Sequence, residues 1–274
     1  MRLFPCGCMG CGGSFMASAA SMPADAAGGA SPLPKSGGAV DRAVFEDLAA
    51  ASRILADQGV VDAFGHVSMR HPHDPSRFLM ARAVAPALVT PDDIMEFTLE
   101  SEPCENRGRN GFLERYIHGR VYANRPDVVG VVHSHSQTVI PFGLTGVPMK
   151  AMFHNAAFLA QGVPVFDISE KFGATDMLVG NNEKGDELAR VMADKPVVLM
   201  RAHGSVAAGP SLPLAVFRAV YTEVSARMQV TATMLGGGGR IAALDAKEGE
   251  LADAVNIGAA GRAWQLWKQR VGFA

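Results

Sequence analysis

A run of small β-forming residues that ends in two histidines constrains this chain more than any other feature. The run covers residues 128–132 (VVGVV), and His133 and His135 follow with one serine between them. Side chains of a strand alternate between its two faces, so residues i and i+2 project from the same face. The two imidazoles are therefore expected side by side at the end of a buried strand, where they can share one metal ion.

A third histidine and a glutamate stand at the ends of other predicted elements. His203 follows a second apolar run, residues 197–200, and Glu114 lies at the start of a predicted helix. Three neutral imidazoles bind Zn²⁺ well and also suit Mn²⁺, Fe²⁺ or Co²⁺. Any one of these histidines alone is more often an ordinary hydrogen-bonded residue, but the set favours a metal. Glu114 is a further ligand, an acid or base beside the metal, or an acid stabilised by the helix dipole.

Composition and charge exclude two classes of partner. The chain has 274 residues, of which 48% are hydrophobic, and its formal net charge is −2. This composition supports a substantial core and offers no basic groove for nucleic acid. No apolar run reaches the ~18 residues that a membrane span needs. We therefore expect a small-molecule ligand and neither a nucleic-acid nor a membrane partner.

The N-terminal segment differs from the rest of the chain. Residues 17–40 are mostly Ala, Gly, Ser and Pro with few large apolar groups. This composition predicts a disordered tail over residues 1–40, followed by a single domain over residues 41–274.

Three of the four cysteines crowd into the first dozen residues, at Cys6, Cys8 and Cys11. They form a metal or redox tract or, as we favour, belong to a disordered tail or precede a true start at Met16 or Met22. The segment lacks the apolar stretch of a secretory signal. At most one thiol, Cys104, belongs to the core, so we expect a reducing, cytoplasmic environment.

Helical and strand patterns interleave along the predicted domain. Helices are expected from Asp41 to about Gly59 and over residues 113–124, 155–161, 183–193, 214–235 and 248–268. Strands are expected over residues 67–69, 77–80, 87–90, 128–132, 163–166, 197–200 and 205–208. Several of these strands are joined by short turns, which favours helices packed on both sides of a mixed or largely antiparallel sheet.

Taken together and in this order, the motifs resemble the class II aldolase/adducin family. The matching segments are Gly65-His66-Val67-Ser68, Val89-Thr90-Pro91, Glu114 with Arg125-Pro126-Asp127, His133-Ser134-His135, and Arg201-Ala202-His203-Gly204. The resemblance implies an α/β fold, a three-layer α/β/α sandwich around a largely antiparallel sheet. It implies one divalent metal ion, Mn²⁺ or Zn²⁺, on His133, His135 and His203, with Glu114 as acid/base or fourth ligand. It also implies a symmetric oligomer, commonly a homotetramer.

The chain departs from the sugar-phosphate members of that family where those members bind phosphate. His66 stands where they carry Asn, and Phe112 and Leu113 stand where small hydroxyl residues precede their catalytic Glu. A phosphate needs several N–H or O–H donors or fixed cations, and two apolar residues supply none. A phosphorylated sugar is therefore not the expected substrate. His154 occupies the segment where the aldolases carry a catalytic tyrosine.

The residues that replace the phosphate site predict a flat aromatic acid as substrate. His66, Ser68 and Phe112 are the candidate wall of the substrate pocket. Arg70 and Arg82 are candidate partners of the substrate carboxylate, with ordinary surface charge as the alternative. The segments FGHVS and VHSHS resemble the family branch that decarboxylates 3-hydroxy-2-methylpyridine-4,5-dicarboxylate or 3,4-dihydroxyphthalate.

We therefore expect a divalent-metal-dependent carbon–carbon lyase that decarboxylates a hydroxylated aromatic or pyridine (di)carboxylate. The metal would accept the negative charge left by CO₂, and Glu114 or His154 would supply the replacing proton. Two alternatives stay open. One is a class II aldolase that cleaves a non-phosphorylated hydroxy-keto acid, and the other is an adducin-like module that binds without catalysis.

Overall fold

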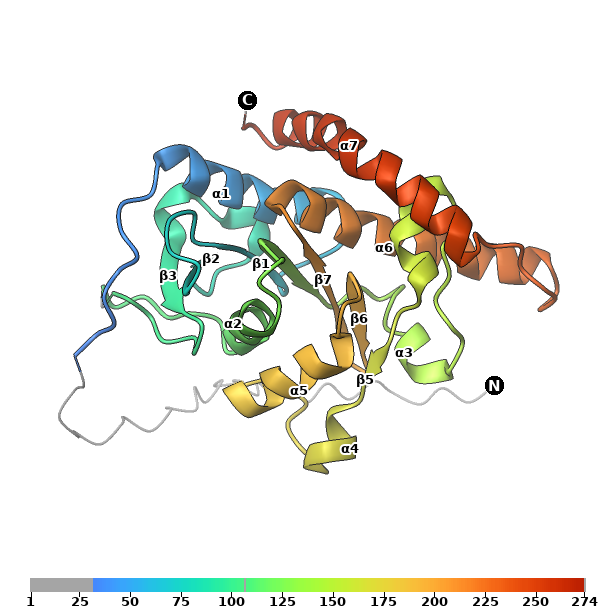
Figure 1. Ribbon diagram of the computed structural model, residues 1–274, viewed down its shortest axis with the longest axis horizontal. Coiled ribbons are helices and arrows are strands. Elements are labelled where there is room, and N and C mark those ends of the chain that lie inside the picture. The colour runs from blue at the N-terminus through green and yellow to red at the C-terminus, as the bar shows by residue number, and fades with distance from the viewer. Residues whose placement is uncertain (1–31, 106, 274) are drawn as a thin grey trace, which may run out of the picture. The chain divides into compact units, whose positions relative to one another are not determined.

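Figure 1 shows the computed structural model, which describes residues 32–105 and 107–273. The chain divides into the units Met1–Pro32 and Leu33–Ala274, and the fold below is that of the second unit. The tract of Cys6, Cys8 and Cys11 lies outside the described residues.

The segment just before the first helix lies against two strands of the sheet. The Gly37 N–H donates to the Glu96 carboxylate at 2.6 Å, and the Arg77 side chain donates to the Lys35 carbonyl at 3.1 Å. The predicted boundary at residue 41 stays a prediction, but hydrogen bonding to the sheet begins before it.

A seven-stranded sheet forms the central layer, in the order β3-β2-β1-β4-β7-β6-β5. Only β5 and β6 pair in parallel, so the expectation of a largely antiparallel sheet is confirmed. The strands are β1 (His66–Arg70), β2 (Arg77–Ala81), β3 (Ile94–Thr98), β4 (Gly130–Ser134), β5 (Val165–Phe166), β6 (Val197–Met200) and β7 (Gly204–Gly209).

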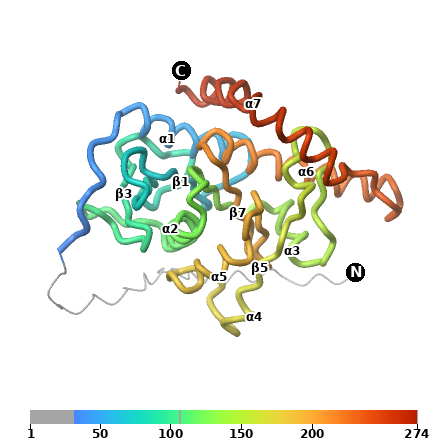
Figure 2. The backbone as a smooth tube through the Cα atoms, viewed as in Figure 1, coloured from blue at the N-terminus to red at the C-terminus, as the bar shows by residue number. Residues whose placement is uncertain are grey.

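Helices cover both faces of this sheet, as Figure 1 and the tube in Figure 2 show. One face packs against α1 (Arg42–Asp57), α6 (Leu212–Leu235), α7 (Ala246–Arg270), η3 (His154–Gln161) and α3 (Phe142–Thr145). The other packs against α2 (Arg115–Asn124), α4 (Ile168–Phe172) and α5 (Asn182–Met192). The predicted three-layer sandwich is confirmed. Within the described residues, no helix combines the length and the apolar character that a membrane crossing requires.

Strand alternation decides which core each residue joins. Val131 of β4 belongs to the core under α2, whereas its neighbour Val132 belongs to the core under α1 and α6. Residues of β4 with odd numbers therefore face α2. His133 shares that parity, so β4 directs it toward the N-terminus of α2.

One predicted strand, over residues 87–90, is wrong. Its first half belongs to the 3-10 turn η1 (Pro86–Leu88), and Val89 and Thr90 link this turn to a second one, η2 (Pro91–Asp93), after which the edge strand β3 begins. Proline has a fixed φ and no N–H, so it favours the first position of a turn over a place in a strand ladder. A capping box between Thr90 and Asp93 closes the second turn.

Candidate metal centre

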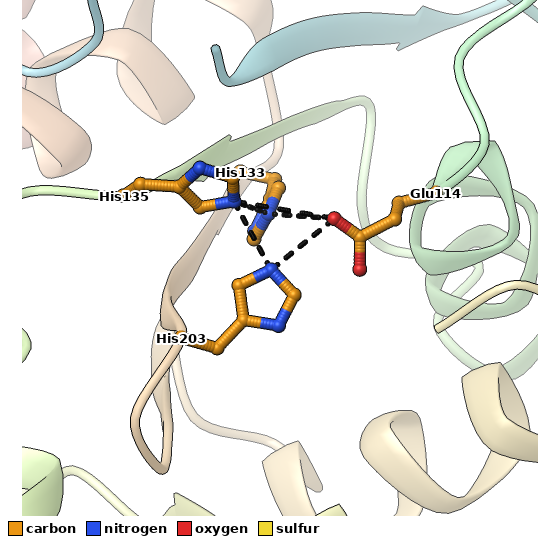
Figure 3. Close-up of side chains that lie close together, drawn as sticks. All are labelled: Glu114, His133, His135 and His203. Atoms are coloured by element: carbon orange, nitrogen blue, oxygen red, sulfur yellow. Dashed lines mark hydrogen bonds and ion pairs between the residues drawn. The ribbon is translucent and has the colours of Figure 1, made fainter. Parts of the chain in front are cut away.

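Four side chains from separate parts of the chain converge in Figure 3: Glu114, His133, His135 and His203, which we call the ligand cluster. The His135 Nε2 atom lies 2.9 Å from the His133 Nε2 and 3.0 Å from the His203 Nε2. The Glu114 Oε2 atom lies 3.4 Å from the His133 Nε2 and 3.2 Å from the His203 Nε2. The fold thus brings together the four residues that the sequence nominated as ligands.

The backbone explains why these side chains meet. His133 ends β4, His135 follows it with the same parity, and His203 lies in the turn between β6 and β7. Gly204 permits the close approach of β7 to the end of β4, because a Cβ at that position would lie 2.0 Å from the Ser134 carbonyl oxygen. Glu114 is the N-cap residue of α2, whose N-terminus faces the end of β4.

Backbone carbonyls decide the tautomers of two histidines. The His133 Nδ1 lies 3.1 Å from the Ser205 carbonyl, and the His203 Nδ1 lies 3.0 Å from the Met177 carbonyl. A carbonyl only accepts, so each Nδ1 carries hydrogen and each neutral ring presents a bare Nε2 lone pair to the cluster.

Bare nitrogens that face one another at this distance repel unless a cation lies between them. Ligand atoms at ~2.0–2.1 Å from a tetrahedral metal ion lie about 3.4 Å apart, and five distances between ligand atoms of the cluster bracket this value, from 2.9 Å to 4.0 Å. Both the donor set and the spacing therefore fit a divalent metal ion.

One short segment orients both His203 and Glu114. The Val179 N–H donates to the Glu114 Oε1 at 3.0 Å, which leaves Oε2 directed at the histidines. Two residues earlier, the Met177 carbonyl accepts from His203. Met177 has a φ of 67°, a left-handed conformation that side-chain-bearing residues adopt rarely. Such strain persists where surrounding contacts require it, as at functional sites. Sequence reasoning missed Met177 and Val179 because they act through backbone atoms.

Electrostatic interactions favour an ionised carboxylate at the centre. Burial raises the pKa of the Glu114 carboxyl, but hydrogen bonds and charge interactions with His133 and His203 outweigh burial and hold that pKa well below its usual range. Burial, with the neighbouring His133 and His203, lowers the pKa of His135 to about 4. Burial also lowers the pKa of His203, but a hydrogen bond to the Glu114 carboxylate and the negative charge of that carboxylate raise this pKa overall. Binding of a cation would displace a proton held on the His203 Nε2.

His66, Ser68 and Phe112, the predicted pocket wall, lie next to the ligand cluster. His66 is the register partner of His133 across β1 and β4, and the two ring centroids are 5.1 Å apart. The Phe112 ring packs against the His66 ring, with the two ring centroids 4.6 Å apart. Ser68 lies deeper and contacts His118 and Tyr122 of α2, two residues that the sequence did not assign to the pocket.

Arg70, a predicted partner of the substrate carboxylate, has other partners in the structure. Its guanidinium is buried and donates to backbone carbonyls of Pro75, Tyr122, Arg125 and Val128. Buried donors must be satisfied, and these carbonyls satisfy them without a ligand. Arg70 therefore pins β1 to the loop ends around it.

Arg82 and His154 likewise have other partners. Arg82 pairs with Asp93 at 2.6 Å. His154 is exposed at the start of η3, with its Nδ1 3.3 Å from the Asn155 Oδ1. Within the described part of the chain, neither residue contacts the ligand cluster.

Known proteins resemble this chain in sequence and in fold. The family model for the class II aldolase and adducin N-terminal domain matches residues 46–230. Decarboxylase tropJ of Talaromyces stipitatus is 36% identical over 195 residues, covering 66% of this chain and 73% of that protein. The 3,4-dihydroxyphthalate decarboxylase of Arthrobacter keyseri is 28% identical over 241 residues, covering 82% and 92%. The solved L-fuculose 1-phosphate aldolase of Glaciozyma antarctica matches with a TM-score of 0.69 at 20% identity, over 89% of this chain and 95% of that one.

Proposed function

The chain belongs to the class II aldolase and adducin family, and from this premise we propose that it is a divalent-metal-dependent lyase that decarboxylates a hydroxylated aromatic or pyridine (di)carboxylate. The observation that carries the proposal is the convergence of Glu114, His133, His135 and His203. The names of the relatives, a decarboxylase and several 3,4-dihydroxyphthalate decarboxylases, support the substrate class.

The histidines of the ligand cluster would hold the ion through Nε2, and Glu114 would hold it through Oε2. A bound ion supplies Lewis acidity, which draws electron density from the hydroxyl and carboxylate oxygens of the substrate. Mn²⁺ and Zn²⁺ both suit this donor set. The chain contributes rigid placement, because two carbonyls and the Val179 N–H orient three of the four ligands.

A proton must replace the carboxyl group that leaves as CO₂. The lowered pKa of Glu114 means that its carboxylate is ionised near neutral pH and carries no proton to donate. We therefore place Glu114 in the ligand set rather than as the direct proton donor. His154 remains the other predicted donor, although it is exposed and has no described contact with the cluster.

The residues beside the cluster favour an aromatic acid over a sugar phosphate. Phe112 and Leu113 precede Glu114, and the Phe112 ring lies against His66. Neither residue offers the donors that a phosphate requires. The likeness to the fuculose phosphate aldolase, at 20% identity, concerns the fold alone. Cleavage of a non-phosphorylated hydroxy-keto acid stays the alternative reaction, and a purely binding, adducin-like module would have no use for four converging ligands.

Metal-reconstitution assays test the proposal. The protein is stripped with a chelator, reloaded with Mn²⁺ or Zn²⁺, and assayed for CO₂ release from 3,4-dihydroxyphthalate. We expect turnover only with metal, none in His133→Ala, and full turnover in His73→Ala, which removes an exposed histidine outside the cluster. Full activity without metal, or release of an aldehyde from a hydroxy-keto acid in place of CO₂, would contradict the proposal.

Assembly and location remain proposals as well. We propose a homotetramer and a cytoplasmic location, from the family resemblance and from the cysteine distribution respectively. Sedimentation of the purified protein measures the first.

A further inference from the structure

A row of buried hydrogen bonds leads from the ligand cluster into the core, and the proposed reaction does not use it. The His66 Nδ1 lies 2.7 Å from the His118 Nε2. The His118 Nδ1 lies 2.6 Å from the Ser68 Oγ, which lies 2.7 Å from the Tyr122 hydroxyl. All four side chains are buried, with His118 and Ser68 fully enclosed. We call His66, His118, Ser68 and Tyr122 the buried row.

The far end of the row sets its direction. The Tyr122 hydroxyl lies 3.3 Å from the Val129 carbonyl, which can only accept a hydrogen bond. If Tyr122 donates to that carbonyl, its oxygen accepts from the Ser68 hydroxyl, and the Ser68 oxygen accepts from the His118 Nδ1–H. The bare His118 Nε2 then accepts from the His66 Nδ1–H.

This direction places one hydrogen in every contact of the row. In the opposite direction Tyr122 donates to Ser68, and its contact with the Val129 carbonyl holds no hydrogen. Buried polar groups are rarely left unpaired, so the first direction is the favoured one. It leaves the His66 Nε2 without a hydrogen.

The His66 Nε2 is the free end of the row. It has no hydrogen-bond partner among residues 32–105 and 107–273, and its ring lies between the His133 ring and the Phe112 ring. We propose that the buried row locks His66 as a hydrogen-bond acceptor that binds a hydroxyl group of the substrate. The inference rests on the proposed function for the nature of the ligand, and it makes His66 a specificity-determining residue.

The lock follows from simple rules of donor and acceptor. A bare nitrogen attracts a hydroxyl hydrogen and repels a carboxylate or an ether oxygen. A substrate would therefore turn its hydroxyl toward His66 and its leaving carboxylate elsewhere. The row is not a path for protons, because the Val129 carbonyl at its end cannot take one up.

The charge state of the row is consistent with a tautomer lock. Burial, with the nearby His133, lowers the pKa of His118 to about 3, so this ring is neutral at physiological pH. The lock then depends only on which nitrogen of a neutral ring carries the hydrogen.

Histidine NMR tests the lock without turnover. In protein labelled with ¹⁵N-histidine, with and without Zn²⁺, His66 and His118 should both carry hydrogen on Nδ1. Their resonances are assigned by their loss in His66→Gln and His118→Gln. In Tyr122→Phe the Ser68 hydroxyl must donate to the His118 Nδ1, so both rings should move their hydrogen to Nε2.

A matched variant controls for general disturbance of α2. Tyr116 lies on the same helix, half-buried and outside the row, so Tyr116→Phe should leave both tautomers unchanged. Hydrogen on the His66 Nε2 of the wild type, or unchanged tautomers in Tyr122→Phe, would overturn the lock.

Two small probes test the acceptor role. Salicylate and 2-methoxybenzoate differ by the hydrogen that His66 would accept, and one hydrogen bond changes affinity by ~2–10-fold. The measured quantity is the ratio of the two dissociation constants, Kd for 2-methoxybenzoate over Kd for salicylate, with Zn²⁺ bound. This ratio should be larger by that factor in the wild type than in Tyr122→Phe. Direct contacts with the metal cancel, since both proteins make them. Equal preferences in the two proteins would overturn the acceptor role.

The two proposals fail separately. The tautomers are read in the absence of substrate, so a failure to release CO₂ would reject the proposed function on its own. A reversed tautomer in an active decarboxylase would reject only the lock.

Discussion

The ligand cluster and the buried row are neighbouring polar groups on the same face of the sheet, yet they are built on opposite principles. The cluster gathers Glu114, His133, His135 and His203 with bare nitrogens facing one another, so its hydrogen bonding is incomplete without a cation. The row gathers four side chains from β1 and α2 whose donors and acceptors match one another. The three imidazoles of the cluster therefore serve binding, and the two imidazoles of the row serve a defined tautomer.

Backbone carbonyls explain how both arrangements arise from the same residue type. In the cluster, the carbonyls of Ser205 and Met177 accept hydrogen bonds from the Nδ1–H groups of His133 and His203. The Nε2 atoms of these two rings therefore carry no hydrogen and face a common point. In the row, the Val129 carbonyl sets the direction of the hydrogen bonds, which end at the bare Nε2 of His66. The chemistry of a histidine in this protein is decided by what its second nitrogen contacts.

The largest expected effect is on the cluster alone. His203→Ala removes one ligand, and the loss of several kcal/mol of metal-derived stabilisation should lower kcat/KM for decarboxylation by at least about 10³-fold. Metal content and steady-state rates measure it. If His203→Ala keeps its metal and its rate, the cluster is not a metal centre and the contrast with the row disappears.

Acid should lower the free energy of unfolding through histidines of both regions. The pKa of His118 falls to about 3 in the folded protein from an ordinary 6.5, and that of His135 falls to about 4. Between these values the unfolded chain binds protons that the folded chain does not, so the free energy of unfolding should fall as pH drops from about 6.5 to about 3. For His118 alone the loss is on the order of 4 kcal/mol.

Denaturant midpoints measured across this pH window test the acid effect. The decline should be shallower in His118→Gln, which removes a ring with a strongly lowered pKa that has no place in the ligand cluster. Equal slopes in the wild type and the variant would show that the buried row does not contribute.

Gly204→Ala should disturb the cluster through the backbone. The new Cβ would lie 2.0 Å from the Ser134 carbonyl oxygen, so β7 must move away from β4. We expect a loss of about 3 kcal/mol in the free energy of unfolding, together with weaker metal binding. Gly180→Ala is the matched control, since no atom lies within 4 Å of its Cβ. Urea titration of both variants would show whether the close approach of β7 matters.

Arg70→Lys should separate a structural arginine from a substrate-binding one, with the smallest effect of the series. The lysine cannot reproduce the set of guanidinium hydrogen bonds to four carbonyls, so stability should fall by about 2 kcal/mol. The affinity for metal and the KM should stay near the wild-type values. A large rise in KM with unchanged stability would return Arg70 to the substrate site.

Local pattern accounts for most of the fold that could be predicted. The short continuous apolar runs of β2, β4 and β6 and the amphipathic stretches of α1, α5 and α6 are properties of neighbouring residues, so the sequence alone shows them. The error over residues 87–90 has the same origin. Val89 and Thr90 are β-forming residues, but Pro86 and Pro91 restrict the backbone more strongly than those side chains do.

The sequence alone determined the identity of the four candidate metal ligands, because imidazole and carboxylate side chains can bind a metal ion in any fold. Only the tertiary structure decided which nitrogens are bare, which backbone atoms of Met177 and Val179 aim the ligands, and that the Arg70 guanidinium is already occupied. The physical reason is that a hydrogen bond depends on the position of two atoms in space. Here those atoms come from segments far apart along the chain.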